Sequence, residues 1–192
     1  MGIEFEVKFR ATPEILATLR EKTPGPETLL QMQTTYYDTP SGALSARHYT
    51  LRRRMENDLS VCTLKTPADG LGRREFEVEK ASIEEAIPEL CKLSGLEELP
   101  SLLSGGIVPV CGARFTRIAK TVTLADCTVE LALDQGVLTG GGKEIPLCEA
   151  EVELKEGTRE AALAYAAQLA VAFGLVQEKE SKFRRAQKLA GY

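Results

Sequence analysis

The sequence predicts an α+β protein in which eight antiparallel strands form a closed β-barrel with helices packed outside. Eight segments alternate apolar and polar residues, which is the period of a β-strand whose two faces differ. Short turn sequences rich in Gly, Pro, Asn and Asp separate several of these segments, and only a few segments carry helix signals. Strands joined by short turns pair antiparallel, and closure into a barrel would leave the sheet without exposed edges.

The strands are predicted from alternation between turn signals. The turn sequences are PSG at 40–42, ENDL at 56–59, ADGLG at 68–72 and GGG at 140–142. The predicted strands are residues 3–10, 32–38, 48–55, 59–66, 72–79, 114–125, 127–135 and 145–155.

Four helices are predicted from a Ser or Thr that can cap the first helical turn. Thr12 is followed by Pro13 and opens TPEILATLREK, while Ser82 and Glu85 have the spacing of a capping box. The other predicted boundaries are about Leu93 for the second helix, Thr158 to Gly174 for a long Ala-rich helix, and Ser181 for the start of a short basic helix.

The composition is that of one globular domain, which we expect to span residues 1–192. Of the 192 residues 43% are hydrophobic, which is enough for one sizeable core. The net charge of −4 argues against a nucleic-acid partner, since proteins that bind nucleic acid are normally basic. The five cysteines include no CxxC pair, which fits reduced thiols in a cytoplasmic protein better than disulfides or a zinc site.

Two further patterns argue against a signal peptide and against a membrane partner. Glu4 and Glu6 stand where the apolar stretch of a signal peptide would begin. The most apolar stretch, residues 161–176, is shorter than the roughly 20 residues that a membrane span needs, and it contains Gln168. We therefore predict that this stretch is a buried helix.

The polar faces of most predicted strands are charged. In IEFEVKF at the start of the chain, Glu4, Glu6 and Lys8 share one face and apolar residues share the other. Basic residues dominate the third and fourth strands, and acidic residues dominate the seventh and eighth. The charged positions on one face of the later strands are Arg52 and Arg54, Lys65, Arg73 with Glu75, Glu130 with Asp134, and Glu149 with Glu151 and Glu153.

Two arrangements explain such a charged face. In the first, the sheet is open, its charged face is solvated and helices cover its apolar face. In the second, the sheet closes with its apolar face outward under helices, and the charged face lines an interior cavity. A charged interior is costly unless the charges pair and take up an ionic ligand. The separation of basic from acidic strands favours the second arrangement.

The separated charges suit a phosphorylated ligand together with a metal ion. Guanidinium and ammonium groups match phosphate oxygens, so the basic strands predict a binding site for a multiply charged anion. Clustered carboxylates repel one another unless they hold a hard divalent cation such as Mg²⁺ or Mn²⁺. A cation, a polyphosphate and a base around one cavity are the requirements of phosphoryl transfer.

The N-terminal stretch EFEVK at residues 4–8 resembles the E-x-E-x-K signature of the CYTH superfamily, the triphosphate tunnel metalloenzymes. Further similar segments follow in family order through almost the whole chain, including TYYDTPSGAL at 35–44. The ALDQG run at 132–136 and the strand from Glu149 to Glu153 are most similar to bacterial inorganic triphosphatases.

This resemblance implies a triphosphate tunnel in which a divalent cation, Mg²⁺ or Mn²⁺, supports cleavage of a triphosphate, with inorganic triphosphate the preferred substrate. It implies phosphate binding by Lys8, Arg52, Arg54, Lys65, Arg73, Arg117 and Lys182. It implies metal binding by Glu4, Glu6, Glu75, Glu149, Glu151 and Glu153, with catalytic roles for Glu4, Glu6 and Lys8. We expect a second metal, or a carboxylate such as Glu130 or Asp134, to orient the attacking water. Arg53 departs from the pattern, because an outward apolar residue is usual at its position.

The sequence leaves other functions open. Hydrolysis of thiamine triphosphate and cyclisation of ATP would use the same triphosphate contacts on the same scaffold. Few aromatic residues stand where they could grip a thiazolium or purine ring, which favours the inorganic substrate. A non-catalytic module that binds polyphosphate or nucleotide would need the basic face but not the carboxylates. In each case we expect a small-molecule ligand and a monomer or homodimer.

Overall fold

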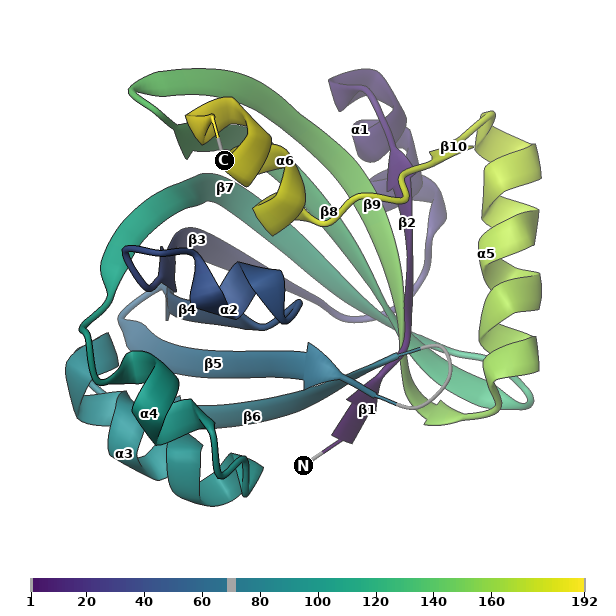
Figure 1. Ribbon diagram of the computed structural model, residues 1–192. Coiled ribbons are helices and arrows are strands. Elements are labelled where there is room, and N and C mark those ends of the chain that lie inside the picture. The colour runs from purple at the N-terminus through teal and green to yellow at the C-terminus, as the bar shows by residue number, and fades with distance from the viewer. Residues whose placement is uncertain (1, 69–71, 192) are drawn as a thin grey trace.

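The computed structural model describes residues 2–68 and 72–191, with residues 2–4 described by their backbone alone. This part of the chain contains ten strands and six helices (Figure 1). The strands are β1 (Gly2–Glu4), β2 (Glu6–Arg10), β3 (Glu27–Asp38), β4 (Thr50–Glu56), β5 (Leu59–Pro67), β6 (Arg73–Glu79), β7 (Val108–Thr123), β8 (Cys127–Gly140), β9 (Lys143–Gly157) and β10 (Val176–Gln177). The helices are α1 (Pro13–Lys22), α2 (Ala43–Ala46), α3 (Ile83–Ser94), α4 (Leu99–Leu103), α5 (Arg159–Phe173) and α6 (Lys182–Ala190).

The strands form one antiparallel sheet in the order β1-β6-β5-β4-β3-β7-β8-β9-β2-β10. The predicted strand 3–10 is divided at Phe5, because its first half pairs with β6 and its second half pairs with β9. The predicted α+β class with an antiparallel sheet is confirmed. The predicted closed barrel of eight strands is not confirmed, since hydrogen bonds among the described residues do not close the sheet. Instead, the chain crosses from one end of a strongly curved sheet to the other at Phe5 (Figure 1).

Several strands are longer than alternation predicts. Residues 27–31 of β3 pair with residues 116–120 of β7, although ETLLQ does not alternate regularly. Residues 108–113 of β7 and residues 136–140 of β8 also pair with neighbouring strands. Pairing with a neighbouring strand therefore decides the strand ends, as it commonly does in sheets. Of the predicted turn 68–72, residues 69–71 lie outside the described residues.

The four predicted helix starts are confirmed by their capping contacts. The hydroxyl oxygens of Thr12, Ser82, Thr158 and Ser181 accept hydrogen bonds from backbone N–H groups three residues later, at 3.3, 3.2, 3.3 and 3.1 Å. The short helices α2 and α4 were not predicted, because neither has a side-chain cap at its N-terminus.

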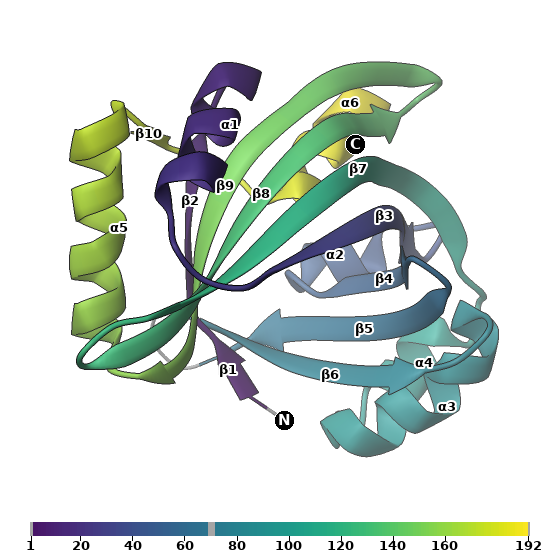
Figure 2. The same ribbon diagram turned by 180° about the vertical axis from the view of Figure 1, so that it is seen from behind.

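The outer, convex face of the sheet is apolar and lies under helices. Leu131 and Val152 belong to one buried cluster that the sheet shares with α1 and α5. Leu64 and Phe76 belong to a second cluster that β5 and β6 share with α3 and α4 (Figure 2). The expectation that the apolar face points outward under helices therefore holds. Among the described residues, none of the helices is both long enough and apolar enough to span a lipid bilayer.

Helix α6 lies on the concave side of the sheet, against β7 and β8 (Figure 1). Its Ala186 is fully buried, and a Cβ added to Gly140 of β8 would lie 2.5 Å from the Ala186 carbonyl oxygen. The ring of Phe183 lies 5.0 Å from that of Tyr36 on β3, measured between centroids. These contacts bring the basic N-terminal turn of α6 to the concave face of the sheet.

Gly136 should be needed for the close pairing of β8 with β7. A Cβ at this position would lie 2.1 Å from the Arg114 carbonyl oxygen and 2.5 Å from Phe115 Cα, both on β7. We expect Gly136→Ala to lower the free energy of unfolding by about 2 kcal/mol or more, because the strands must move apart. Chemical denaturation measures this change. Gly105→Ala, where a Cβ has nothing within 4 Å, is the control and should stay within about 0.5 kcal/mol of wild type.

Candidate functional site

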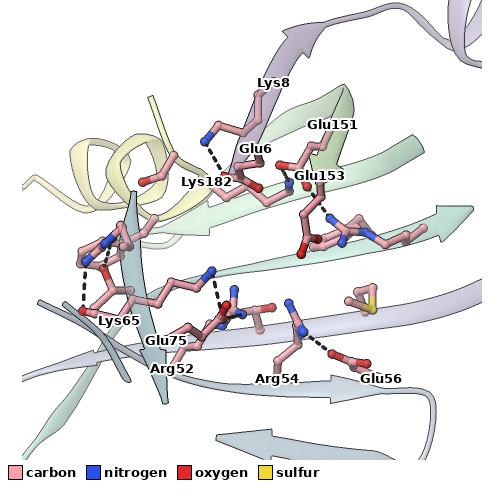
Figure 3. A pocket seen from close by; sticks show the side chains of 18 of the residues that line it. Glu6, Lys8, Arg52, Arg54, Glu56, Lys65, Glu75, Glu151, Glu153 and Lys182 are labelled. Carbon is pink, nitrogen blue, oxygen red and sulfur yellow. Dashed lines mark hydrogen bonds and ion pairs between the residues drawn. The ribbon is translucent and has the colours of Figure 1, made fainter. Parts of the chain in front are cut away.

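A cavity of about 330 Å³ opens on the concave face of the sheet (Figure 3). Its lining comes from β2 to β9 and from α6, so it joins segments from both ends of the chain. Among the described residues, eight basic and seven acidic side chains line it. The basic residues are Lys8, Arg52, Arg54, Lys65, Arg73, Arg117, Lys155 and Lys182, and the acidic residues are Glu6, Glu56, Glu75, Glu77, Glu130, Glu151 and Glu153.

Strands β4 and β5 provide a basic wall. Alternation in TLRRRM directs Arg52 and Arg54 to the concave face, while Arg53 between them points to the other face and donates to Ser60 Oγ at 2.9 Å. The predicted orientation of Arg52 and Arg54 is therefore correct despite the unusual charge at Arg53. Lys65 faces the same cavity from β5.

Arg54 is a buried cation with unused donor capacity. Its Nε is buried and has no hydrogen-bond partner among the described residues, although its Nη2 contacts Glu56. Burial and the neighbouring Arg52 lower the pKa of Arg54, because both disfavour the charged form. An anion in the cavity would relieve the repulsion between the two guanidinium groups and accept the remaining hydrogen bonds.

Carboxylates from three neighbouring strands form an acidic row opposite this wall. Glu6 on β2 pairs in register with Glu153 on β9, which pairs in register with Glu130 on β8. All three line the cavity. Lys8 Nζ lies 2.9 Å from Glu6, and Lys155 Nζ lies 2.8 Å from Glu153, so two ammonium groups partly neutralise the row.

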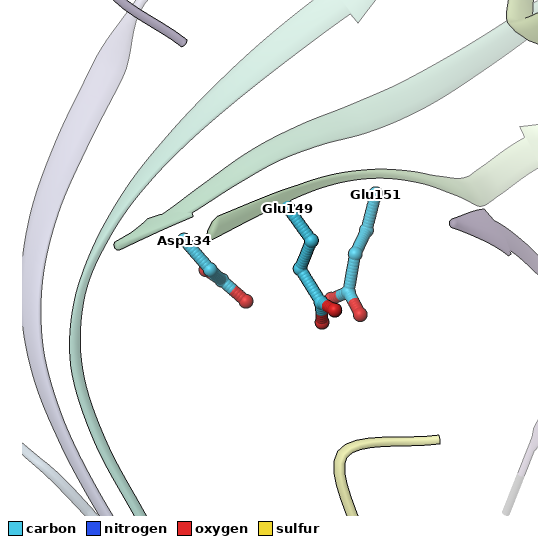
Figure 4. A group of neighbouring side chains, drawn as sticks. All are labelled: Asp134, Glu149 and Glu151. Atoms are coloured by element: carbon cyan, nitrogen blue, oxygen red, sulfur yellow. The ribbon is translucent and has the colours of Figure 1, made fainter. Parts of the chain in front are cut away.

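A second acidic group, Asp134, Glu149 and Glu151, lies deeper in the sheet (Figure 4). Each residue has a carboxylate oxygen within 4.8 Å of the other two, and all three residues are buried. Arg117 donates from Nε and Nη2 to the two oxygens of Asp134, both at 2.7 Å, and from Nη2 to Glu151 at 2.6 Å. Lys182 Nζ lies 2.8 Å from both Asp134 and Glu151.

Helix α6 completes the neutralisation of this buried group. Lys182 also contacts Glu149, and Arg185, one turn further along the helix, contacts Glu149 from the other side. Three carboxylates, which are almost completely removed from water, therefore meet three cations. Such a group is stable only while every charge keeps its partners.

The ionisation of these residues follows from their partners. Burial alone would raise the pKa of Glu151, but Lys182 and Arg117 hold it well below its usual range. Burial raises the pKa of Glu149 despite its contacts with Lys182 and Arg185. Burial favours the neutral amine of Lys182, yet Asp134, Glu151 and Glu149 raise its pKa, so the ammonium form persists.

Both acidic groups offer the hard oxygen ligands that Mg²⁺ and Mn²⁺ prefer. Asp134, Glu149 and Glu151 are close enough to share a cation, but three basic side chains already contact them. Glu6, Glu130 and Glu153 face the open cavity, where a metal could also reach a bound anion. The residues present therefore fit a divalent cation.

The structure brings most of the predicted site residues together. Glu6, Lys8, Arg52, Arg54, Lys65, Arg73, Glu75, Arg117, Glu130, Glu151, Glu153 and Lys182 all line the cavity. Asp134 and Glu149 lie behind its wall, fully buried. The side chain of Glu4 lies outside the described residues. The roles assigned to these residues remain predictions.

Two residues differ in position or contacts from what the sequence suggests. Arg73 lines the cavity, but its guanidinium donates to Thr50 Oγ1, at 3.1 Å, and to the carbonyl oxygens of His48 and Lys65, at 2.6 and 3.0 Å. These hydrogen bonds also link the start of β4 to the end of β5.

Arg185 was not predicted as a site residue. Its position one turn after Lys182 on a short basic helix was the signal that could have found it.

Together, the curved antiparallel sheet and its ionic cavity define an α+β protein whose cavity residues could hold a polyanion and a divalent cation. The chain belongs to the CYTH domain family, which matches residues 2–186. It is 33% identical over 162 residues to an inorganic triphosphatase of Haemophilus influenzae, a match that covers 80% of this chain and 46% of that protein. The chain therefore spans about half the length of this curated relative.

Solved structures share the fold. A candidate adenylyl cyclase from Hippeastrum, described as having a dominant triphosphatase activity, superposes with a TM-score of 0.67 and 19% identity, covering 98% of this chain and 96% of that chain. A candidate adenylate cyclase from Bacillus halodurans gives a TM-score of 0.65 and 20% identity, covering 95% and 96%. At these identities the similarity shows the fold alone.

Lys182 should be essential for the stability of the buried ion group. In Lys182→Met, Asp134, Glu149 and Glu151 lose their shared ammonium and keep only the two guanidinium groups. We expect the free energy of unfolding to fall by about 3–5 kcal/mol, since removal of one partner leaves a buried charge uncompensated. Urea denaturation measures the loss.

The matched control is Lys188→Met on the same helix. The Lys188 side chain is 57% exposed and forms an ion pair with Glu180, whose side chain is 40% exposed. Its removal should change stability by less than about 1 kcal/mol. Equal losses in the two variants would show that the buried ion group has no special part in stability.

Proposed function

We propose that this protein is a metal-dependent triphosphatase that hydrolyses inorganic triphosphate to pyrophosphate and phosphate. The observation that supports the proposal is one cavity with a basic wall from β4 and β5 facing an acidic row from β2, β8 and β9. Membership of the CYTH family, and a relative that is named an inorganic triphosphatase, agree with it.

The charge balance of the cavity supports a metal-bound substrate. The eight basic and seven acidic side chains among its described lining residues leave it nearly neutral. A triphosphate brings several negative charges, so such a cavity should hold it more tightly when a cation enters with it. Excess positive charge alone would have suited a module that binds polyphosphate without a metal.

The basic residues would bind and orient the phosphate groups. Arg52, Arg54 and Lys65 face the cavity from one wall, and Arg117 and Lys182 face it from the opposite side. Guanidinium groups hold phosphate oxygens in fixed directions, which lowers the entropic part of the barrier to transfer. The same groups stabilise the charge that the transferred phosphate oxygens carry.

The carboxylates would hold the metal and the attacking water. Glu6, Glu151 and Glu153, with Glu4, Glu75 and Glu149 as further predicted ligands, would bind Mg²⁺ or Mn²⁺, which neutralises phosphate oxygens when it is bound. Between the two residues proposed to orient water, Glu130 is the better placed. It lines the cavity, whereas both Asp134 oxygens already accept from Arg117.

The direct test is release of phosphate by the purified protein with Mg²⁺ or Mn²⁺. We expect inorganic triphosphate to be cleaved with a higher kcat/KM than ATP or thiamine triphosphate. Formation of cyclic AMP from ATP, or a clear preference for thiamine triphosphate, would replace the proposed activity by another on the same scaffold. Triphosphate binding with no phosphate release from any substrate would indicate a binding module.

Arg54 should contribute strongly to substrate binding. Its buried guanidinium has a donor without a partner among the described residues, so Arg54→Ala removes a contact that only a bound anion would complete. We expect KM for triphosphate to rise about 30-fold or more, which corresponds to about 2 kcal/mol. Arg53→Ala, on the opposite face of the same strand, is the control and should leave KM within about threefold of wild type.

Glu6 should bind the metal rather than stabilise the fold. We expect Glu6→Gln to raise the Mg²⁺ concentration for half-maximal phosphate release about tenfold or more, because a hard cation loses a carboxylate ligand. The metal-free melting temperature should stay the same or rise, since the variant has less carboxylate repulsion and the Gln amide oxygen can still accept the Lys8 hydrogen bond. Glu97→Gln, an exposed residue outside the cavity, is the control. Superimposable metal titrations of wild type and Glu6→Gln would refute the assignment.

A further inference from the structure

Glu75 forms ion pairs with two cations of the basic wall that a phosphate group would also bind. Its Oε1 lies 3.0 Å from Lys65 Nζ and 3.2 Å from Arg52 Nη2 (Figure 3). Glu75 and Lys65 are direct cross-strand partners on β6 and β5, while Arg52 approaches from β4. One carboxylate oxygen therefore lies between an ammonium and a guanidinium, as a phosphate oxygen would.

The environment of Glu75 differs from that of the buried acidic group. Its side chain is 19% exposed and lines the cavity, whereas the side chains of Asp134 and Glu149 are 0% exposed. A buried carboxylate that loses its cations is left unpaired away from water, which is strongly unfavourable. Glu75 is partly exposed and faces the open cavity, so water can reach its carboxylate after it loses them, and its displacement costs less.

We propose that Glu75 is an internal counter-ion, which shares its single negative charge between Arg52 and Lys65 until a triphosphate displaces it from them. This inference rests on the proposed function for the identity of the anion. The released carboxylate remains beside the phosphate oxygens that took its place, and two such negative groups repel unless a divalent cation lies between them. Displacement of Glu75 therefore couples triphosphate binding to metal binding.

The first test measures binding of inorganic triphosphate in EDTA, where no metal is available and no hydrolysis can follow. By isothermal titration calorimetry, Glu75→Gln should bind triphosphate about tenfold more tightly than wild type, because the anion no longer competes with an internal carboxylate. The control is Glu79→Gln, which removes an exposed carboxylate from the same face of β6 outside the cavity lining. It should change affinity by less than about twofold.

Unchanged affinity in Glu75→Gln would overturn the proposal. Weaker binding would also overturn it, since it would mean that Glu75 holds Arg52 and Lys65 in position for the anion. If the variant does not fold, carboxyl-carbon NMR of the wild-type protein gives the answer. Triphosphate added in EDTA should shift the Glu75 side-chain resonance and leave that of Glu79 in place, and no shift of Glu75 would overturn the proposal.

The second test measures the coupling to metal. The affinity for a non-hydrolysable imido analogue of triphosphate is compared with and without Mg²⁺, for wild type and Glu75→Gln. Complexation of the analogue by Mg²⁺ in solution is the same for both proteins and cancels. We expect the gain in affinity from Mg²⁺ to be at least about threefold larger in wild type, and equal gains would contradict the coupling.

The two hypotheses fail in different ways. If the protein binds triphosphate in EDTA and Glu75→Gln binds it more tightly, but no phosphate is released with any metal, the proposed function fails and the counter-ion role stands. If wild type hydrolyses triphosphate but Glu75→Gln binds it no more tightly than wild type does, the proposed function stands and the counter-ion role fails.

Discussion

The arrangement of the cavity depends on one buried group of charges. Arg117, Lys182 and Arg185 neutralise Asp134, Glu149 and Glu151, and these six side chains connect β7, β8, β9 and α6. Because the three carboxylates are almost completely removed from water, the network tolerates no missing partner. Because the buried carboxylates of β8 and β9 need cationic partners, their contacts with Lys182 and Arg185 help to fix the position of α6.

The ion pairs of the cavity differ in how easily a ligand can replace them. Pairs around Asp134 and Glu149 are buried and have several partners, so they form part of the permanent structure. Pairs such as that of Glu75 with Lys65 lie at the cavity surface, where water or a bound ion can take over from the carboxylate. A nearly neutral cavity of this kind can exchange internal charge for a metal–anion complex without leaving a charge unpaired.

The assembly of the cavity depends on the backbone at two places. The first is Phe5, where the N-terminal segment leaves β6 and joins β9, so that residues 2–10 pair with strands near opposite ends of the sheet. The second is Gly140, where the absence of a side chain lets α6 lie against β8. Both bring together residues that are distant in the sequence, such as Glu6 with Glu153 and Lys182 with Asp134. The cavity follows from these contacts rather than from any single motif.

Alternation and capping residues by themselves determined the strand faces, the four longer helices and most of the charged residues that line the cavity, whereas Arg117 and Lys182 were assigned only through the family resemblance. Side-chain direction in a strand follows sequence position, so Arg52, Arg54 and Glu151 could be assigned to the concave face from sequence. Pairing between distant segments, which no local pattern encodes, decided three other features. They are the interruption of the first strand at Phe5, the sheet that hydrogen bonds do not close, and the extra length of β7. Contacts between distant segments also decided which carboxylates are buried. Asp134 and Glu149 look like other acidic strand residues in the sequence, and only packing against α6 removes them from water and gives them cationic partners.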